Sequence, residues 1–267
     1  NDTVADLAAR GRSDVAARAA GRQAELDSTM AEAETEVAVA AELLGSSGMD
    51  WPQLLDRDWS APPWVDGRAR VGTFDVAVPG RSLAQAACVL PFPASRCLAI
   101  DAPAARREDA IALARSIVLR VLASTPPGKT EVTFIDPVAI GASIADLLHL
   151  GDYDARLVDT RPRTSMAEIE SRLAEHAAHL ETVISKYLRG QFHSLGEYNQ
   201  AAGEMAEALR LIVIFDFPAQ FSDRATEQLL SIIENGPRCG IVTLLVHDPE
   251  RNPSREVSTE RLLRSMD

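Results

Sequence analysis

The chain has 267 residues, of which 46% are hydrophobic and 25% are charged. These proportions exclude wholesale disorder, and the length suits one or two globular domains. The formal net charge of −12 opposes binding to nucleic acid, which depends on neutralised phosphates, although a local basic groove is compatible with it. No apolar run is long enough for a transmembrane helix. The N-terminus lacks the pattern of a signal peptide, and the start at Asn1 suggests a trimmed or fragmentary chain.

The cysteines and histidines predict neither a disulfide framework nor a metal site. Cys88, Cys97 and Cys239 form no C-x-x-C pair, and an odd number of cysteines is typical of reduced core thiols in the cytosol. His176 and His179 could share a helix face, but no further ligand at a suitable spacing completes a metal set. We therefore expect a cytoplasmic protein that binds no metal in this chain and makes no contact with a membrane.

Residues 1–48 predict a helical, coiled-coil-like arm. The segment is rich in alanine, and from Leu26 onwards apolar residues recur at alternating spacings of four and three (Leu26, Met30, Ala33, Val37, Ala40 and Leu44). The sequence 45–48, Gly-Ser-Ser-Gly, would end the helix. Two uses are open for the arm: contact with a partner or neighbouring module, and packing on its own domain. Residues 49–68, with two proline-containing stretches, are expected to be a linker.

Residues 69–250 predict an α/β domain, and residues 251–267 a C-terminal extension. A strand is expected at 70–79. Short apolar strands are then expected at 96–102, 130–137, 209–216 and 239–246, with helices at 105–124, 139–148, 164–189 and 224–235. Such alternation is typical of a parallel sheet covered on both faces, which makes three layers. Ligands of such sheets bind at the carboxyl ends of the strands, which here carry Asp101, Asp136, Asp216, His247 and Asp248.

One stretch is similar to the phosphate-binding Walker A motif but stands in the wrong context. In Pro126-Pro127-Gly128-Lys129-Thr130, the position of the motif's first glycine is Ala123. A helix precedes this stretch and a strand follows it, whereas a phosphate loop needs the reverse order. We interpret it as a turn between helix and strand.

The strand–loop–helix unit that should hold phosphates begins with the strand at 97–100. Aligning the Walker A pattern there places Asp101 and Arg106 at the two glycines, Arg107 at the lysine and Glu108 at the Ser/Thr. Without glycines the loop cannot easily present its amides inward, and Glu108 beside Asp109 would repel a triphosphate. Arg107 could touch a phosphate, but it cannot replace a glycine cradle.

The Walker B position has also lost a residue that catalysis needs. Asp216 ends an apolar strand, as a ligand of magnesium-bound water would, or as a polar strand end that caps a loop. The residue that follows it is Phe217, where an acid usually activates the attacking water. Without that general base, hydrolysis should fall by at least about a hundredfold.

The order of elements over residues 67–248 resembles the motor domain of the FtsK/SpoIIIE family of DNA translocases. Four segments carry the resemblance: VTFIDP (132–137), SLGEYN (194–199), LRLIVIFDF (209–217) and IIENGPRCGIVTLLVHDP (232–249). The residues that differ from the family's pattern stand at the positions that carry the family's chemistry. The Walker A glycines and lysine are absent, Phe217 replaces an acid, Val138 replaces a lysine, and His247-Asp248 replaces the nucleotide-sensing Thr-Gln pair. The resemblance implies a three-layer, RecA-like P-loop NTPase fold in which the reaction has been lost.

We therefore predict a non-catalytic, pseudo-ATPase module that acts as a scaffold or regulator through protein contacts. It would hold no cofactor, and an intact module outside this chain would bind ATP and magnesium. Its partner would be an adjacent ATPase module or a second copy. One alternative is an active ATP-binding DNA motor component in which Arg106, Arg107 and Asp216 converge on a phosphate; another is an unrelated α/β domain. Contact with DNA is possible through the parent protein; the candidate patch, for which a solvated loop is the favoured interpretation, is Arg156, Arg161 and Arg163.

Overall fold

The computed structural model describes residues 3–44, 48–56, 67–78, 81–93, 96–251 and 256–266. The chain divides into two units, residues 1–54 with 72–88 and residues 55–71 with 89–267, and each is described by itself. Half of the expected linker (57–66, including the segment 61–64) and three of the four residues expected to end the first helix lie outside the described residues.

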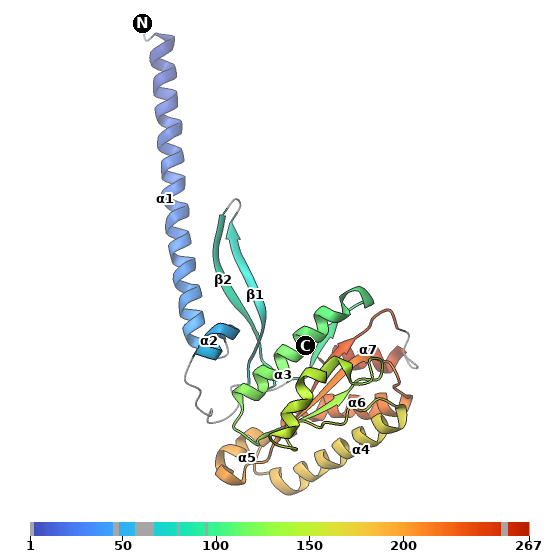
Figure 1. Cartoon of the computed structure of the whole chain (residues 1–267). Helices are drawn as coiled ribbons and strands as arrows, with labels where there is room; N and C mark the ends of the chain where they lie inside the picture. The colour runs from blue at the N-terminus through green and yellow to red at the C-terminus, as the bar shows by residue number, and fades with distance from the viewer. Residues whose placement is uncertain are drawn as a thin grey trace. The chain divides into compact units, whose positions relative to one another are not determined.

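The first unit contains one long helix, most of a short second helix and most of a two-stranded ribbon (Figure 1). Helix α1 (Val4–Leu44) confirms the predicted N-terminal helix, and α2 (Trp51–Asp56) is short. Strand β1 (Ala69–Val78) was expected; it pairs with β2 (Arg81–Leu90), which was not. The sequence of β2, RSLAQAACVL, does not predict a strand, because alanine, glutamine and serine have little β propensity.

A four-stranded parallel sheet forms the centre of the second unit. Its strands are β3 (Leu98–Asp101), β4 (Thr130–Ile135), β5 (Leu209–Phe217) and β6 (Ile241–His247), in the order β3-β6-β5-β4. All four strands were expected from their apolar runs. Residues 157–163 run beside the edge strand β4, through bridges between Val132 and Val158 and between Ile135 and Arg163.

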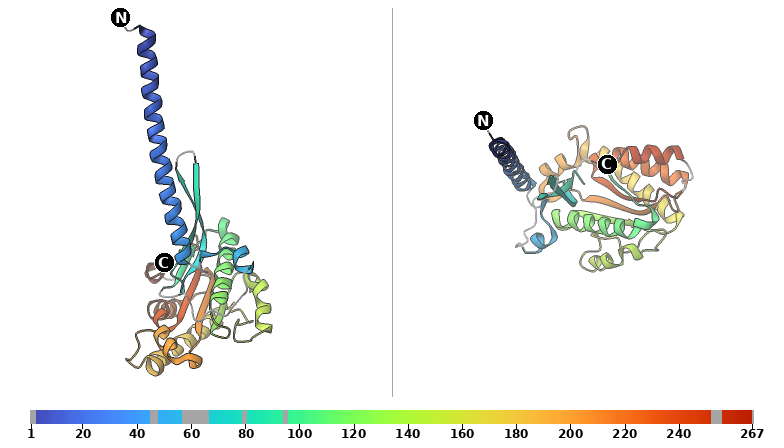
Figure 2. Two further views of the ribbon diagram at one scale, coloured as in Figure 1. Left: turned by 90° about the vertical axis from the view of Figure 1, so that its left-hand side faces the viewer. Right: turned by 90° about the horizontal axis from the view of Figure 1, so that it is seen from above.

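Successive side chains along the strands enter two cores, one on each face of the sheet. Val213 and Phe215 of β5 pack in the core that contains α3 (Arg107–Ser124), whereas Ile212 and Ile214 enter the core that contains α4 (Met166–Thr182) and α6 (Asp223–Asn235). Figure 2 shows α3 on one side of the sheet and the helices of the other layer on the opposite side. The predicted three-layer α/β architecture is therefore confirmed.

The remaining helices differ in detail from the sequence-based expectation. The long helix expected at 164–189 ends α-helically at Thr182 and continues as a π-helical turn, Val183–Leu188. The segment expected to be helical at 139–148 is a 3-10 helix, Ala142–Asp152. Helices α5 (Leu195–Ala202) and α7 (Glu256–Arg264) pack in the same core as α4 and α6, and Leu262 of α7 is fully buried there. Within the described parts of the chain, no helix has both the length and the apolar character needed to cross a bilayer.

Candidate nucleotide site

Arg107 and Asp216 form a two-pronged ion pair at the carboxyl edge of the sheet. Nε of Arg107 donates to Oδ1 of Asp216 at 2.6 Å, and Nη2 donates to Oδ2 at 2.7 Å. The side chain of Asp216 is 6% exposed and that of Arg107 is 25% exposed. The hydrogen bond to Asp216 raises the pKa of Arg107 above its ordinary value, so the guanidinium keeps its charge. The position aligned with the Walker A lysine therefore holds a cation whose partner is the carboxylate aligned with Walker B.

The end of β5 is irregular, and this irregularity turns Asp216 toward α3. The register between β5 and β6 shifts between Ile214 and Phe217, as at a β-bulge. Asp216 has a φ of 55°, a left-handed conformation that costs a non-glycine residue roughly 1 kcal/mol. Phe217 is fully buried and packs edge-on against Phe221 at 4.9 Å between ring centroids. The residue after Asp216 is thus part of the core, where an acid would face the reaction.

A second buried carboxylate fixes the neighbouring loop. Asp136, at the end of β4, is fully buried, and its Oδ2 accepts hydrogen bonds from the amides of Gly141 at 2.9 Å and Ser143 at 3.1 Å. Oγ of Ser143 in turn accepts from Nη2 of Arg107 at 3.3 Å. Gly141 has a φ of 89°, and a Cβ there would lie 3.0 Å from Pro162, so the loop requires glycine. The ion pair is therefore linked to β4 as well as to β5.

Most amides of the loop between β3 and α3 already donate to acceptors within the protein. Pro103 has no N–H group. Four amides of this region donate within the protein: Ala102 to the His247 carbonyl, Ala104 to Oε2 of Glu250, Arg106 to the Pro103 carbonyl and Arg107 to the Ala104 carbonyl. The contact with Glu250 matters most, because its carboxylate accepts the hydrogen bond that the amide of Ala104 could otherwise donate to a phosphate. A glycine-rich loop would instead turn such amides toward the ligand.

Charged side chains around this loop are paired with one another. Oδ1 of Asp101 lies 2.7 Å from Nδ1 of His247, which joins the first Walker A position to the end of β6. Nη1 of Arg107 lies 3.2 Å from Glu108, and Nη1 of Arg106 lies 3.0 Å from Asp109. The cations that could meet a phosphate therefore lie beside carboxylates.

These residues do not fit ATP with magnesium. The carboxylate of Asp216, aligned with the Walker B acid, holds a guanidinium, and four amides of the loop region already have acceptors. No three His, Cys, Asp or Glu side chains gather as a metal site anywhere in the described part of the chain. Sequence reasoning missed Ser143, Glu250 and Pro103. None of these three carried a readable signal, because the Walker A pattern leaves position 103 free and the other two residues lie outside the pattern.

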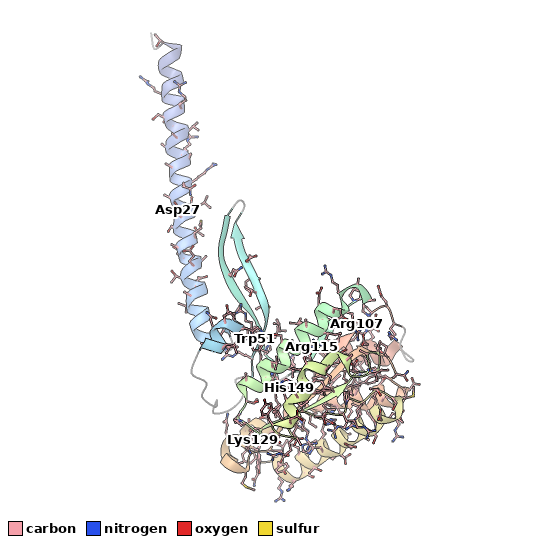
Figure 3. All side chains as sticks on the ribbon, viewed as in Figure 1. Asp27, Trp51, Arg107, Arg115, Lys129 and His149 are labelled. Atoms are coloured by element: carbon pink, nitrogen blue, oxygen red, sulfur yellow. The ribbon has the colours of Figure 1, made fainter. Side chains whose placement is uncertain are left out.

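The Walker A-like stretch lies at the other end of α3, as expected for a turn (Figure 3). Gly128 has a φ of 72°, and Thr130 begins β4. Nζ of Lys129 donates to the carbonyl of Ala206 at 2.7 Å. This lysine therefore ties the turn to the segment before β5, and α3 separates it from Arg107.

Each arginine of the candidate DNA patch has a carboxylate partner. Arg156 pairs with Asp154 at 3.1 Å, Arg161 with Glu168 at 3.1 Å and Arg163 with Asp159 at 2.6 Å. These pairs reduce the positive charge that a phosphate backbone would meet. Contact of this patch with DNA stays a prediction.

No protein-family model and no curated protein matches the sequence, but solved structures share its fold. The conjugation coupling protein TcpA of pCW3, in its monomer form with ATPγS, is 12% identical, with a TM-score of 0.56, and the match covers 77% of this chain and 56% of that chain. The cytoplasmic domain of the type VII secretion ATPase EccC of Thermomonospora curvata is 22% identical, with a TM-score of 0.55, over 83% and 26%. ATPases 2 and 3 of EssC from Geobacillus thermodenitrificans are 13% identical, with a TM-score of 0.53, over 77% and 37%.

At these identities the likeness establishes the fold. It confirms the predicted P-loop NTPase class and, at the level of the fold, the resemblance to FtsK/SpoIIIE-type ATPases. The chain corresponds to 56% of the TcpA chain, 26% of the EccC chain and 37% of the EssC chain, so it matches only part of each.

Proposed function

We propose that this chain, which has the fold of an FtsK/SpoIIIE-type ATPase module, is a pseudo-ATPase module of a larger ATPase or DNA translocase. It acts as a scaffold or regulator through protein contacts in the cytoplasm. An intact module outside this chain binds ATP and magnesium, and any contact with DNA belongs to the parent protein. The neighbours TcpA, EccC and EssC support the setting, since they are described as a conjugation coupling protein and as ATPases.

The observation that carries the proposal is the ion pair between Arg107 and Asp216. A nucleotide would have to displace a guanidinium that donates two hydrogen bonds to a nearly buried carboxylate. Its phosphates would also have to compete with Glu250 for the amide of Ala104. Phe217 supplies no general base, so a nucleotide that did bind would lack the group that activates water.

Calorimetric titration of the purified chain with ATP and magnesium tests the proposal. We expect no heat of binding up to about 1 mM nucleotide, which corresponds to less than about 4 kcal/mol of binding free energy. An intact ATPase of the same fold, titrated under the same conditions, is the positive control. Binding tighter than about 100 µM together with phosphate release would refute the pseudo-ATPase assignment.

The alternative is an active motor component with an atypical phosphate loop. One observation favours it: Arg107 and Asp216, two of the three residues that it requires, do lie together. On that alternative, Arg107→Ala abolishes nucleotide binding that the natural chain displays. On our proposal, neither the natural chain nor the variant binds nucleotide.

A further inference from the structure

Helix α1 leaves a long stretch exposed on all its faces. Every residue from 10 to 29 is exposed, whereas Met30, the next residue, is only 7% exposed. Figure 3 labels Asp27 in this stretch. The stretch includes two large apolar side chains, Val15 at 68% and Leu26 at 49% exposed. Because isolated helices of this kind are only marginally stable in water, a partner that covered these side chains would stabilise the stretch.

Val15 and Leu26 lie on the same face of the helix. They are separated by eleven positions, which is about three helical turns. Ala19 and Arg22 lie between them on that face, so the spacing is four, three, four. The face continues into Met30, which is buried. The same apolar seam is therefore covered at Met30 and open from Val15 to Leu26.

The charges of the helix are divided between its two ends. The basic residues precede position 23, and after position 24 the charged residues are acidic as far as the end of the helix. Among residues 10–23, Asp14 is the one acidic residue. The described charges are Arg10, Arg12, Arg18 and Arg22, followed by Glu25, Asp27, Glu32, Glu34 and Glu36. A copy of this helix complements itself when the two run antiparallel, whereas a parallel pair would bring like charges together.

We propose that residues 10–29 of α1 bind the same segment of a second copy as an antiparallel two-helix coiled coil. With the twofold axis between positions 20 and 21, Val15 packs on Leu26 of the partner subunit. In the same register, Arg18 lies opposite Glu25 of the partner subunit, and symmetry repeats both contacts. The pairing does not depend on the pseudo-ATPase assignment. With few apolar side chains in the seam, we expect a dissociation constant on the order of 100 µM at low salt.

Sedimentation equilibrium of the full chain between about 10 µM and 1 mM at low salt tests the pairing. Arg18→Glu or Glu25→Arg alone turns two attractive contacts into two repulsive ones and should weaken association about tenfold or more. The double variant R18E/E25R should return to within about threefold of the natural chain, because the pair is restored with its charges exchanged. Asp27→Arg makes the same charge change away from the seam and should alter association by about twofold at most.

A zero-length cross-link tests the orientation. In Arg18→Lys, a carbodiimide should join Lys at position 18 to Glu25 of the partner subunit, and mixing isotope-labelled with unlabelled chains identifies the link as one between copies. A parallel pair places position 18 beside Gln23, which has no carboxylate and gives no such link. A chain that stays monomeric at 1 mM, or a double variant as weak as its single parents, overturns the proposal. Far-UV circular dichroism verifies that these exposed substitutions leave the helix intact.

Discussion

Two groups of buried ionisable side chains in the second unit differ in whether the ionisable group has a hydrogen-bond partner. At the carboxyl edge of the sheet, Arg107 and Asp216 satisfy each other through two hydrogen bonds. Between α4 and the sheet, His176 is almost fully buried, and neither of its ring nitrogens has a hydrogen-bond partner. Burial, reinforced by the nearby charges of Arg172 and Arg210, lowers the pKa of His176 to about 3.

The difference shows that a buried side chain of this domain carries a charge where an oppositely charged partner is hydrogen-bonded to it. The groups around His176 are already committed to other partners. Arg172 contacts Asp159 and Glu175 and donates to Thr133, Arg210 lies 3.5 Å from Glu131, and burial also lowers the pKa of His179. Among the described residues, no carboxylate is hydrogen-bonded to the imidazole, and the lowered pKa keeps the ring neutral. At the carboxyl edge Arg107 and Asp216 are partners, and the raised pKa of Arg107 keeps its guanidinium charged.

The largest effect is expected from removing one member of the ion pair. Arg107→Ala leaves the carboxylate of Asp216 nearly buried without its cation, which should lower the free energy of unfolding by about 3 kcal/mol. Urea denaturation measures this loss. Arg107→Lys is the control that keeps the charge but loses the fork of two hydrogen bonds, and it should be intermediate.

The double variant R107M/D216N tests whether the two residues contribute to the free energy of unfolding mainly through their contact with each other. If the cost of Arg107→Ala arises from the stranded carboxylate, removing both charges should recover most of the stability. A double variant as unstable as the two single variants combined would mean that the two residues contribute independently. The comparison between the two clusters would then fail.

The second effect is an acid destabilisation caused by His176. The unfolded chain binds a proton on this residue near pH 6.5, but the folded chain does so only near pH 3. The unfolded state therefore holds more protons in this window, and the free energy of unfolding falls as the pH falls from about 6.5 toward 3. At about 1.4 kcal/mol per pH unit, the loss between pH 6.5 and 5 is about 2 kcal/mol.

Denaturation curves at several pH values check this expectation with two histidine variants. His176→Leu should flatten the pH dependence between pH 6.5 and 5. His149→Leu, at an exposed position, should leave the dependence as it is in the natural chain. Equal slopes in the two variants would mean that another group causes the acid sensitivity.

The smallest effect belongs to the Walker A-like turn. Lys129→Ala removes one hydrogen bond, from Nζ to the carbonyl of Ala206, and should cost about 1 kcal/mol or less. Nucleotide titration should give the same result before and after the change. A loss of nucleotide binding in Lys129→Ala would reverse the roles that we assign to the two ends of α3.

The sequence predicted the sheet well because its strands are nearly continuous apolar runs. The runs that contain Ile212 and Leu244 are buried on both faces, and burial of this kind leaves a direct trace in composition. Strand β2 left no such trace, because a ribbon strand with alanine and glutamine lacks both the apolar run and the β-branched residues.

The candidate site could be predicted only in part. Aligning a motif placed Arg107 and Asp216 at facing positions of one edge, but their two-pronged pairing depends on the bulge and positive φ at Asp216. The link from Asp136 through Ser143 spans a loop whose path no local pattern specifies. The carboxylate of Glu250 comes from far along the chain, and only the folded sheet brings it to the amide of Ala104.

The hydrogen bond from the amide of Ala104 to Glu250 means that a change at one residue would not make a phosphate loop of this segment. Replacing Arg107 by lysine would supply a familiar side chain, yet it would remove the two-pronged pairing with Asp216. A glycine-rich loop would also need glycines at positions 101 and 106 and release of the Ala104 amide from Glu250. Since these requirements are separate, we expect any single substitution among them to leave the chain without nucleotide binding.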